Sequence, residues 1–228
     1  MSLVAVAGVA YALGGLTANS RLLGRLGVAT GGATDLRGHA LKWLSAGLLV
    51  GYVLLVEQRG LASVGWRLPD PVPAGAVTFG PPAVALAATG GGFLLVVLAG
   101  SAVSSALARF DVTVEDGMVG RFAALSVPGR LFVALTAAVV EELLFHGYAV
   151  ERLLELTGSP LLAGLLSFGA FTLAHLGDTW GPGEVARIAV PALVTTLLYL
   201  AVRSLPVLIA VHALVDATGL LLADRYAE

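Results

Sequence analysis

Three apolar stretches of this chain carry acidic and histidine side chains that could act together as acids and bases. The adjacent Glu141 and Glu142 lie in the first stretch, His175 ends the second, and His212 and Asp216 lie in the third. A carboxylate and a histidine can hold and activate a water molecule, and a second histidine with an acidic partner can stabilise a developing oxyanion. This set of residues therefore predicts the hydrolysis of an amide bond by activated water.

Spacing indicates which of these side chains share a helix face. Residues four positions apart lie on one face of a helix, whereas Glu141 and Glu142 are separated by about 100° around it. We therefore expect different roles for the two glutamates. Either Asp216 accepts a hydrogen bond from His212 and fixes its tautomer, or both face a common ligand. Three pairs have the four-residue spacing: Glu142 with His146, Phe171 with His175, and His212 with Asp216.

The composition indicates a membrane protein. The 228 residues carry a net charge of −2, and 57% are hydrophobic while only 12% are charged, against about 25% in an ordinary soluble domain. These values argue against a soluble globule, a disordered chain and a basic nucleic-acid binder. The chain has no cysteine, which excludes a thiol nucleophile, a disulfide scaffold and a cysteine-based zinc site. We expect a single integral membrane domain over residues 1–228, in contact with the lipid bilayer.

Hydropathy predicts an all-α bundle of about seven to eight transmembrane helices. A spanning helix needs about 20 mostly apolar residues. The first predicted span, Leu3–Ala18, lacks a preceding basic segment, so we expect a retained span and not a cleaved signal peptide. The second and third predicted spans, Ala40–Val56 and Pro82–Leu107, carry almost nothing comparable to the polar set above. His39, just before the second span, is expected to be a solvated loop residue. The predicted spans are Leu3–Ala18, Ala40–Val56, Pro82–Leu107, Leu131–Leu156, Leu161–Leu176, Val185–Val202 and Leu205–Leu222.

The distribution of basic residues predicts the orientation of the chain. With the N-terminus outside, nine of the 13 Lys and Arg residues fall on the inner side and four on the outer side. Cytoplasmic loops are enriched in Lys and Arg, which favours this orientation. Glu141 then lies roughly 16 Å into the membrane, counted from Arg130 at a rise of about 1.5 Å per residue. We expect a protein of the cell inner membrane whose site faces the cytoplasm.

The polar set also resembles a known family. Its order, Glu141-Glu142, Phe171-x-x-x-His175 and His212-x-x-x-Asp216, is similar to that of the CPBP family. These are the CAAX-protease and bacteriocin-processing intramembrane endopeptidases, also called Abi proteins, which are related to the Ras-converting prenyl protease. The resemblance covers residues 131–222, the expected catalytic core, and Gly60–Trp66 resembles the loop that precedes this core in the family.

The resemblance implies a glutamic peptidase with a buried, inward-facing site. It implies that Glu141 activates water together with His175, and that His212 and Asp216 form the oxyanion site. Its partners would be a peptide or protein substrate in the membrane. The family pairs the second glutamate with an arginine four residues later, whereas this chain has His146 there. A histidine can hydrogen-bond Glu142 but is not a permanent cation, so we expect a pH-sensitive site.

Other interpretations stay open at this point. No cofactor is expected, but Glu, His and Asp can all bind zinc, although the spacing matches no known zinc motif. Buried acids and histidines also form proton relays in transporters, whose usual internal repeat we do not find in this sequence. A catalytically silent membrane scaffold of the same fold is the third possibility, suggested by His146. The sequence does not indicate an oligomeric state.

Overall fold

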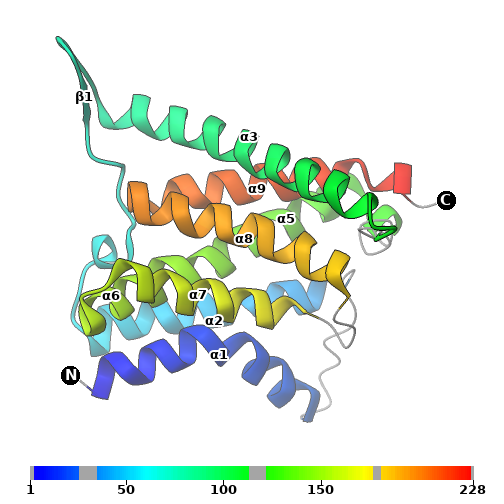
Figure 1. Cartoon of the computed structure of the whole chain (residues 1–228). Helices are drawn as coiled ribbons and strands as arrows, with labels where there is room; N and C mark the ends of the chain where they lie inside the picture. The colour runs from blue at the N-terminus through cyan, green and yellow to red at the C-terminus, as the bar shows by residue number, and fades with distance from the viewer. Residues whose placement is uncertain (1–2, 26–34, 113–121, 177–180, 227–228) are drawn as a thin grey trace.

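The computed structural model describes residues 3–25, 35–112, 122–176 and 181–226. Most of them are helical, and the helices lie side by side in one bundle (Figure 1). The seven predicted stretches correspond to these helices, and α5, η4 and α6 form one continuous rod. The longer elements are α1 (Leu3–Arg25), α2 (Leu36–Gly51), α3 (Pro81–Ala108), α5 (Val127–Glu141), α6 (Glu151–Thr157), α7 (Pro160–His175), α8 (Pro182–Val202) and α9 (Leu205–Leu221). The short ones are η1 (Tyr52–Val56), η2 (Leu61–Val64), η3 (Phe122–Ala124), η4 (Glu142–Val150) and η5 (Ala223–Tyr226).

The apolar helices are those of a membrane protein. Within the described ranges, four are long and apolar enough to cross a bilayer: Leu36–Val56, Pro81–Ala108, Val127–Thr157 and Pro182–Val202. Three shorter apolar segments accompany them, namely Leu3–Gly15, Pro160–His175 and Leu205–Leu221. The predicted fold class, an all-α membrane bundle, is therefore confirmed. The count of seven to eight spans and the extent of the catalytic core, residues 131–222, stay predictions.

A short β-hairpin interrupts the helical pattern after the second span. Strands β1 (Val72–Ala74) and β2 (Val77–Phe79) are antiparallel, with Val72 opposite Phe79. Gly75 supplies the positive φ of the turn, and all six strand residues are exposed. The hairpin projects beyond the bundle next to the start of α3 (Figure 1). The prediction of helices alone missed it, because hydropathy identifies long apolar helices and not short exposed strands.

The rod through the centre of the bundle is not a regular α-helix. Its middle segment, η4, is π-helical, with α5 before it and α6 after it. π-Helical segments are rare and occur frequently at functional sites. Every residue from 141 to 153 is buried. The sequence predicted an ordinary helix over Leu131–Leu156, because hydropathy does not distinguish the two hydrogen-bond patterns.

Helix α2 begins earlier than the sequence suggested. Asp35 caps it, with its side chain accepting a hydrogen bond from the backbone N–H of Arg37 at 3.0 Å. The cap places His39 inside the first turns of the helix, where it is buried. The expectation of a solvated loop histidine was therefore wrong.

Candidate active site

A cavity of about 480 Å³ lies between the central rod and helices α2, α3, α7, α8 and α9. Six of the seven residues singled out from the sequence line it, whereas His146 lies behind its wall. Most of the remaining wall is apolar, so the cavity suits an apolar group placed next to ionisable side chains. The apolar lining includes Val96, Phe122, Val133, Ala137, Ile188, Pro191, Ala192, Val215 and Leu220.

Glu141 and His175 meet at the wall of this cavity. Nε2 of His175 lies 3.1 Å from Oε2 of Glu141, and its Nδ1 lies 2.8 Å from the backbone oxygen of Phe171. A carbonyl oxygen only accepts hydrogen bonds, so Nδ1 carries a hydrogen and Nε2 is directed at the carboxylate. The imidazole also stacks on the ring of Phe171, with centroids 4.2 Å apart and planes at 20°. The imidazole of His175 is thus held in one orientation by Phe171 of its own helix, α7.

Lys42 is a second partner of Glu141 that the sequence analysis missed. Its Nζ lies 3.2 Å from Oε1 of Glu141, and a third of the side chain is exposed. Lys42 belongs to α2, inside the predicted span Ala40–Val56. A lysine within a span is itself an uncommon signal that could have identified it. Glu141 therefore has a cationic group on one oxygen and an imidazole on the other.

Glu142 points to a different set of partners. Nδ1 of His212 lies 2.7 Å from its Oε1, and Nδ1 of His146 lies 2.6 Å from its Oε2. The side chains of Glu142 and His146 are almost fully buried. The two glutamates are therefore directed at different histidines, as their spacing predicts, and Glu142 links the rod to α9.

The outer nitrogens of these two histidines also have partners. Nε2 of His212 lies 3.3 Å from Oδ2 of Asp216, one helical turn later. Nε2 of His146 lies 2.9 Å from Oγ1 of Thr196 on α8. Thr196 was not predicted, and threonine is too common in apolar helices to have marked it. The structure thus brings the predicted set together in two connected groups, one around each glutamate.

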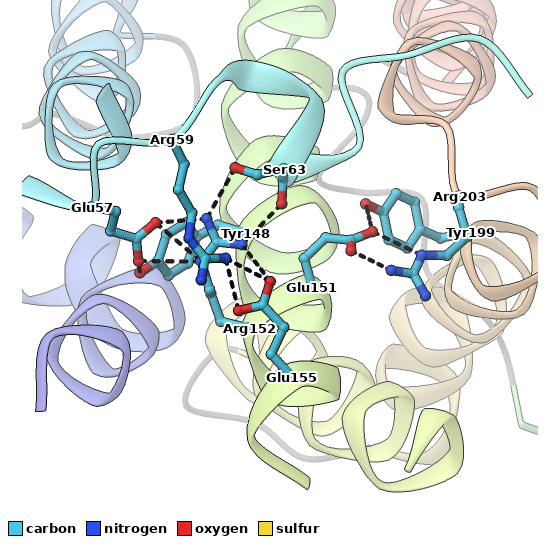
Figure 2. A network of polar contacts seen from close by, with 9 residues as sticks. All are labelled: Glu57, Arg59, Ser63, Tyr148, Glu151, Arg152, Glu155, Tyr199 and Arg203. Atoms are coloured by element: carbon cyan, nitrogen blue, oxygen red, sulfur yellow. Dashed lines mark hydrogen bonds and ion pairs between the residues drawn. The ribbon is translucent and has the colours of Figure 1, made fainter. Parts of the chain in front are cut away.

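A buried ionic network fixes the other end of the rod (Figure 2). Arg152 is fully buried and binds Glu57 through Nη2 at 2.6 Å and the backbone oxygen of Ser63 through Nη1 at 2.9 Å. Tyr148 donates to Glu57 at 2.6 Å. Burial alone would raise the pKa of Glu57, but the hydrogen bonds from Arg152 and Tyr148 outweigh it and lower the pKa below its ordinary value. This network ties the loop 57–67 to the rod that carries the glutamates.

A second ionic group joins the rod to the turn between α8 and α9. Glu151 accepts hydrogen bonds from the hydroxyl of Tyr199 at 2.8 Å and from Nε of Arg203 at 2.8 Å (Figure 2). Both groups lie on the rod C-terminal to His146. The elements that carry Glu142, His146 and Thr196 are therefore fixed relative to each other by contacts outside the cavity.

The described residues do not form a ready metal centre. No group of three or more His, Asp and Glu side chains within the described ranges has an arrangement that could hold a metal ion. The expectation of no cofactor, with zinc as the open alternative, stays a prediction for a chelator experiment.

Comparison with known proteins adds one finding. Residues 123–218 match the family model described as Type II CAAX prenyl endopeptidase Rce1-like. No curated protein and no solved structure gives a significant match. The matched segment contains both glutamates and every histidine described above except His39, whereas Lys42 lies before it.

Proposed function

Because this chain belongs to the CAAX-protease family of membrane proteins, we propose that it is an intramembrane endopeptidase that hydrolyses a peptide bond of a membrane-associated protein or peptide. The observation that carries the proposal is the 3.1 Å contact between Glu141 and His175 at the wall of a largely apolar cavity. A carboxylate paired with an imidazole is a suitable base for a water molecule.

In the proposed reaction, Glu141 accepts a proton from water. Lys42 and His175 both favour its ionised form, which is the form that can take this proton. The water oxygen attacks the scissile carbonyl carbon, and a tetrahedral intermediate with an oxyanion forms. The proton held by Glu141 then passes to the leaving nitrogen, the C–N bond breaks, and one water has been consumed.

We assign the stabilisation of the oxyanion to His212. Its Nδ1 faces Glu142 and its Nε2 faces Asp216, so both nitrogens are placed next to carboxylates. With both carboxylates ionised the ring is doubly protonated, and its Nε2–H, 3.3 Å from Asp216, would be shared with the oxyanion as a charge-assisted donor. Asp216 cannot donate unless it is protonated, so its role in this proposal is to orient His212.

We further propose that the protein lies in the cell inner membrane with the cavity reached from the cytoplasm. The support is the excess of Lys and Arg in the connectors on that side. The chain has no cysteine, so single cysteines can be labelled from either side of sealed vesicles. Arg109→Cys should react from the cytoplasmic side and Asp70→Cys from the opposite side. The reverse pattern would invert the orientation.

A cleavage assay tests the proposed function directly. Purified protein in nanodiscs is incubated with a diverse quenched library of membrane-anchored peptides, with and without a chelator. Glu141→Gln should abolish cleavage, whereas Glu155→Gln, an exposed glutamate of α6 paired with Arg59, should retain it. Cleavage that the chelator does not change supports the glutamate mechanism. If the chelator abolishes cleavage and added zinc restores it, the acidic and histidine side chains of the cavity would be metal ligands instead. An intact library with every variant contradicts the protease proposal.

A further inference from the structure

We propose that the β-hairpin of residues 72–79 is an interfacial anchor, which lays one apolar face on the lipid of the membrane that holds the bundle. The family match begins at residue 123, so it assigns this hairpin no role, and the candidate active site does not include it. The proposal does not depend on peptide hydrolysis. It requires only that the chain is a membrane protein.

The register of the hairpin places most of its apolar side chains on one face. Residues directly opposite each other in an antiparallel pair share a face, and successive residues of a strand alternate between the two faces. The central pair, Pro73 opposite Thr78, therefore lies on one face, and the two flanking pairs lie on the other. These flanking pairs are Val72 with Phe79 and Ala74 with Val77.

The apolar face of the hairpin is left open by the rest of the described chain. Val72, Val77 and Phe79 are 48%, 58% and 48% exposed. A hairpin of two three-residue strands is a single layer, so it cannot bury this face against itself. An open apolar face of this kind marks a contact with another apolar surface.

The charge pattern of the sequence identifies lipid as that surface. Between Asp70 and Arg109 the chain has no Asp, Glu, Lys, Arg or His, and this uncharged stretch contains both the hairpin and the whole of α3. Only 11% of the most apolar part of α3 is buried within the protein, so most of this helix faces lipid. A chain that passed from lipid into water at the start of α3 would carry its first charge there. Here that charge, Asp70, comes before the hairpin.

The length of α3 places the hairpin at the level of the lipid headgroups. The helix has 28 residues and, at about 1.5 Å per residue, is about 42 Å long. This length matches the thickness of a bilayer with its headgroup regions, which is about 40–45 Å. Gly80 alone separates Phe79 from Pro81, the first residue of α3. The hairpin therefore joins the helix in the headgroup region.

The direction of the hairpin also fits a position on the membrane surface. In Figure 1 it runs across the direction of the helices and extends past α3 at the edge of the bundle. Because spanning helices follow the membrane normal, a segment that crosses their direction follows the plane of the membrane. Beyond α3 that plane contains lipid. The anchor would thus hold the start of the helix that contributes Val96 to the cavity wall.

Single cysteines test the proposal, because the chain has none of its own. Val77→Cys, Thr78→Cys and Phe79→Cys are each labelled with a nitroxide in the full chain, in nanodiscs of phosphatidylcholine and phosphatidylglycerol. Paramagnetic resonance then compares the access of oxygen, which concentrates in lipid, with that of a water-soluble nickel chelate. We expect an oxygen-to-nickel ratio at least about threefold higher at positions 77 and 79 than at position 78, which is the matched control on the opposite face.

Two results of this scan would overturn the proposal. Equal ratios at the three positions would show that lipid does not contact one face alone. Low access of both reagents at positions 77 and 79 would show that protein covers the face, which in this purified sample means a second copy of the chain.

A charge on either face provides the second test. With the nitroxide on Phe79→Cys, Val77→Asp should lower the oxygen-to-nickel ratio by about threefold, because a carboxylate beside the label opposes burial in lipid. Thr78→Asp adds the same charge to the other face and should leave the ratio within about 1.5-fold. Val77 and Thr78 are both exposed, so neither variant disturbs the core of the bundle. Equal ratios in the two variants would show that the apolar face does not hold the hairpin.

Discussion

Lys42 and Glu141 form an ion pair across the cavity wall, with Nζ of the lysine 3.2 Å from Oε1 of the glutamate. The other oxygen of Glu141 is in contact with His175, so both sides of the carboxylate are held. Each carboxylate oxygen has two lone-pair positions, and one on each remains available for water. Lys42 therefore orients the proposed base without blocking it.

Replacement of Lys42 by methionine tests this role. Lys42→Met keeps most of the side-chain volume but leaves Oε1 of Glu141 without its cationic partner. We expect kcat to fall by about tenfold, because a charge-assisted hydrogen bond that fixes the base is lost. Lys42→Arg retains the positive charge, so its kcat should fall less than that of Lys42→Met. Steady-state kinetics on a cleaved peptide measure both, and a Lys42→Met enzyme with wild-type kcat would show that His175 alone orients Glu141.

The stacking of Phe171 on His175 leads to a second prediction. The backbone oxygen of Phe171 fixes the tautomer of His175, whereas its ring fixes the plane of the imidazole. Phe171→Leu removes only the ring contact, which in other aromatic pairs contributes about 0.5–1.5 kcal/mol. We expect kcat to fall by about two- to tenfold, and Phe171→Tyr to remain close to wild type. Equal rates for all three proteins would mean that the plane of His175 is set elsewhere.

The buried pair of Glu57 and Arg152 leads to a prediction about stability. Glu57→Gln leaves a fully buried guanidinium without its carboxylate, and such losses cost about 3–5 kcal/mol. Because the pKa of Glu57 is lower in the folded protein than its ordinary value, its contribution is complete above the ordinary pKa and is lost as the pH falls through the lowered one. Denaturant unfolding in detergent at several acidic pH values should show this loss in wild type and not in Glu57→Gln.

Asp224 provides the matched control for this network. It binds Arg130 through two oxygens, at 2.7 Å and 2.9 Å, but its side chain is 68% exposed. Arg130 also donates to the backbone oxygens of Phe122 and Leu125, so it keeps partners when Asp224 is changed. We expect Asp224→Asn to have a clearly smaller effect on unfolding than Glu57→Gln. A reversed order would contradict the importance assigned to the Glu57 network.

The sequence predicted the parts of the site that carry an unusual residue type in an apolar helix. Glu141, Glu142, His175 and His212 are costly in a membrane, and each is found at or beside the cavity. The contact between Glu142 and His146 was also predictable, because it follows from the four-residue spacing. The ranges of the helices followed from hydropathy for the same reason, since chain length and apolar composition directly determine a span.

The remaining features depend on contacts between distant segments. Lys42 meets Glu141 across 99 positions and Thr196 meets His146 across 50, and no local pattern indicates which face of α2 or α8 packs on the rod. Hydropathy also cannot reveal the π-helical hydrogen bonds of η4, because the same apolar residues support either form. His39 was misplaced for a local reason, since the cap by Asp35 was not recognised.

Gly147 lies in η4 at a point where the loop 57–67 passes close to the rod. A Cβ atom there would lie 2.8 Å from the backbone oxygen of Val64 and 3.0 Å from Cδ2 of Leu205. The first contact is with backbone, which cannot rotate away as a side chain can. We therefore expect Gly147→Ala to displace η2 or the rod and to lower the free energy of unfolding by about 1–3 kcal/mol, as overpacking does in other cores.

Gly169→Ala is the control, because a Cβ at Gly169 of α7 meets nothing within 4 Å and alanine favours the helix by about 1 kcal/mol. Since Gly147 lies next to His146, kcat should fall with stability in Gly147→Ala and not in Gly169→Ala. Parallel melting curves and cleavage rates of the two variants measure both effects, and a Gly147→Ala protein as stable and active as wild type would show that η2 does not press on the rod.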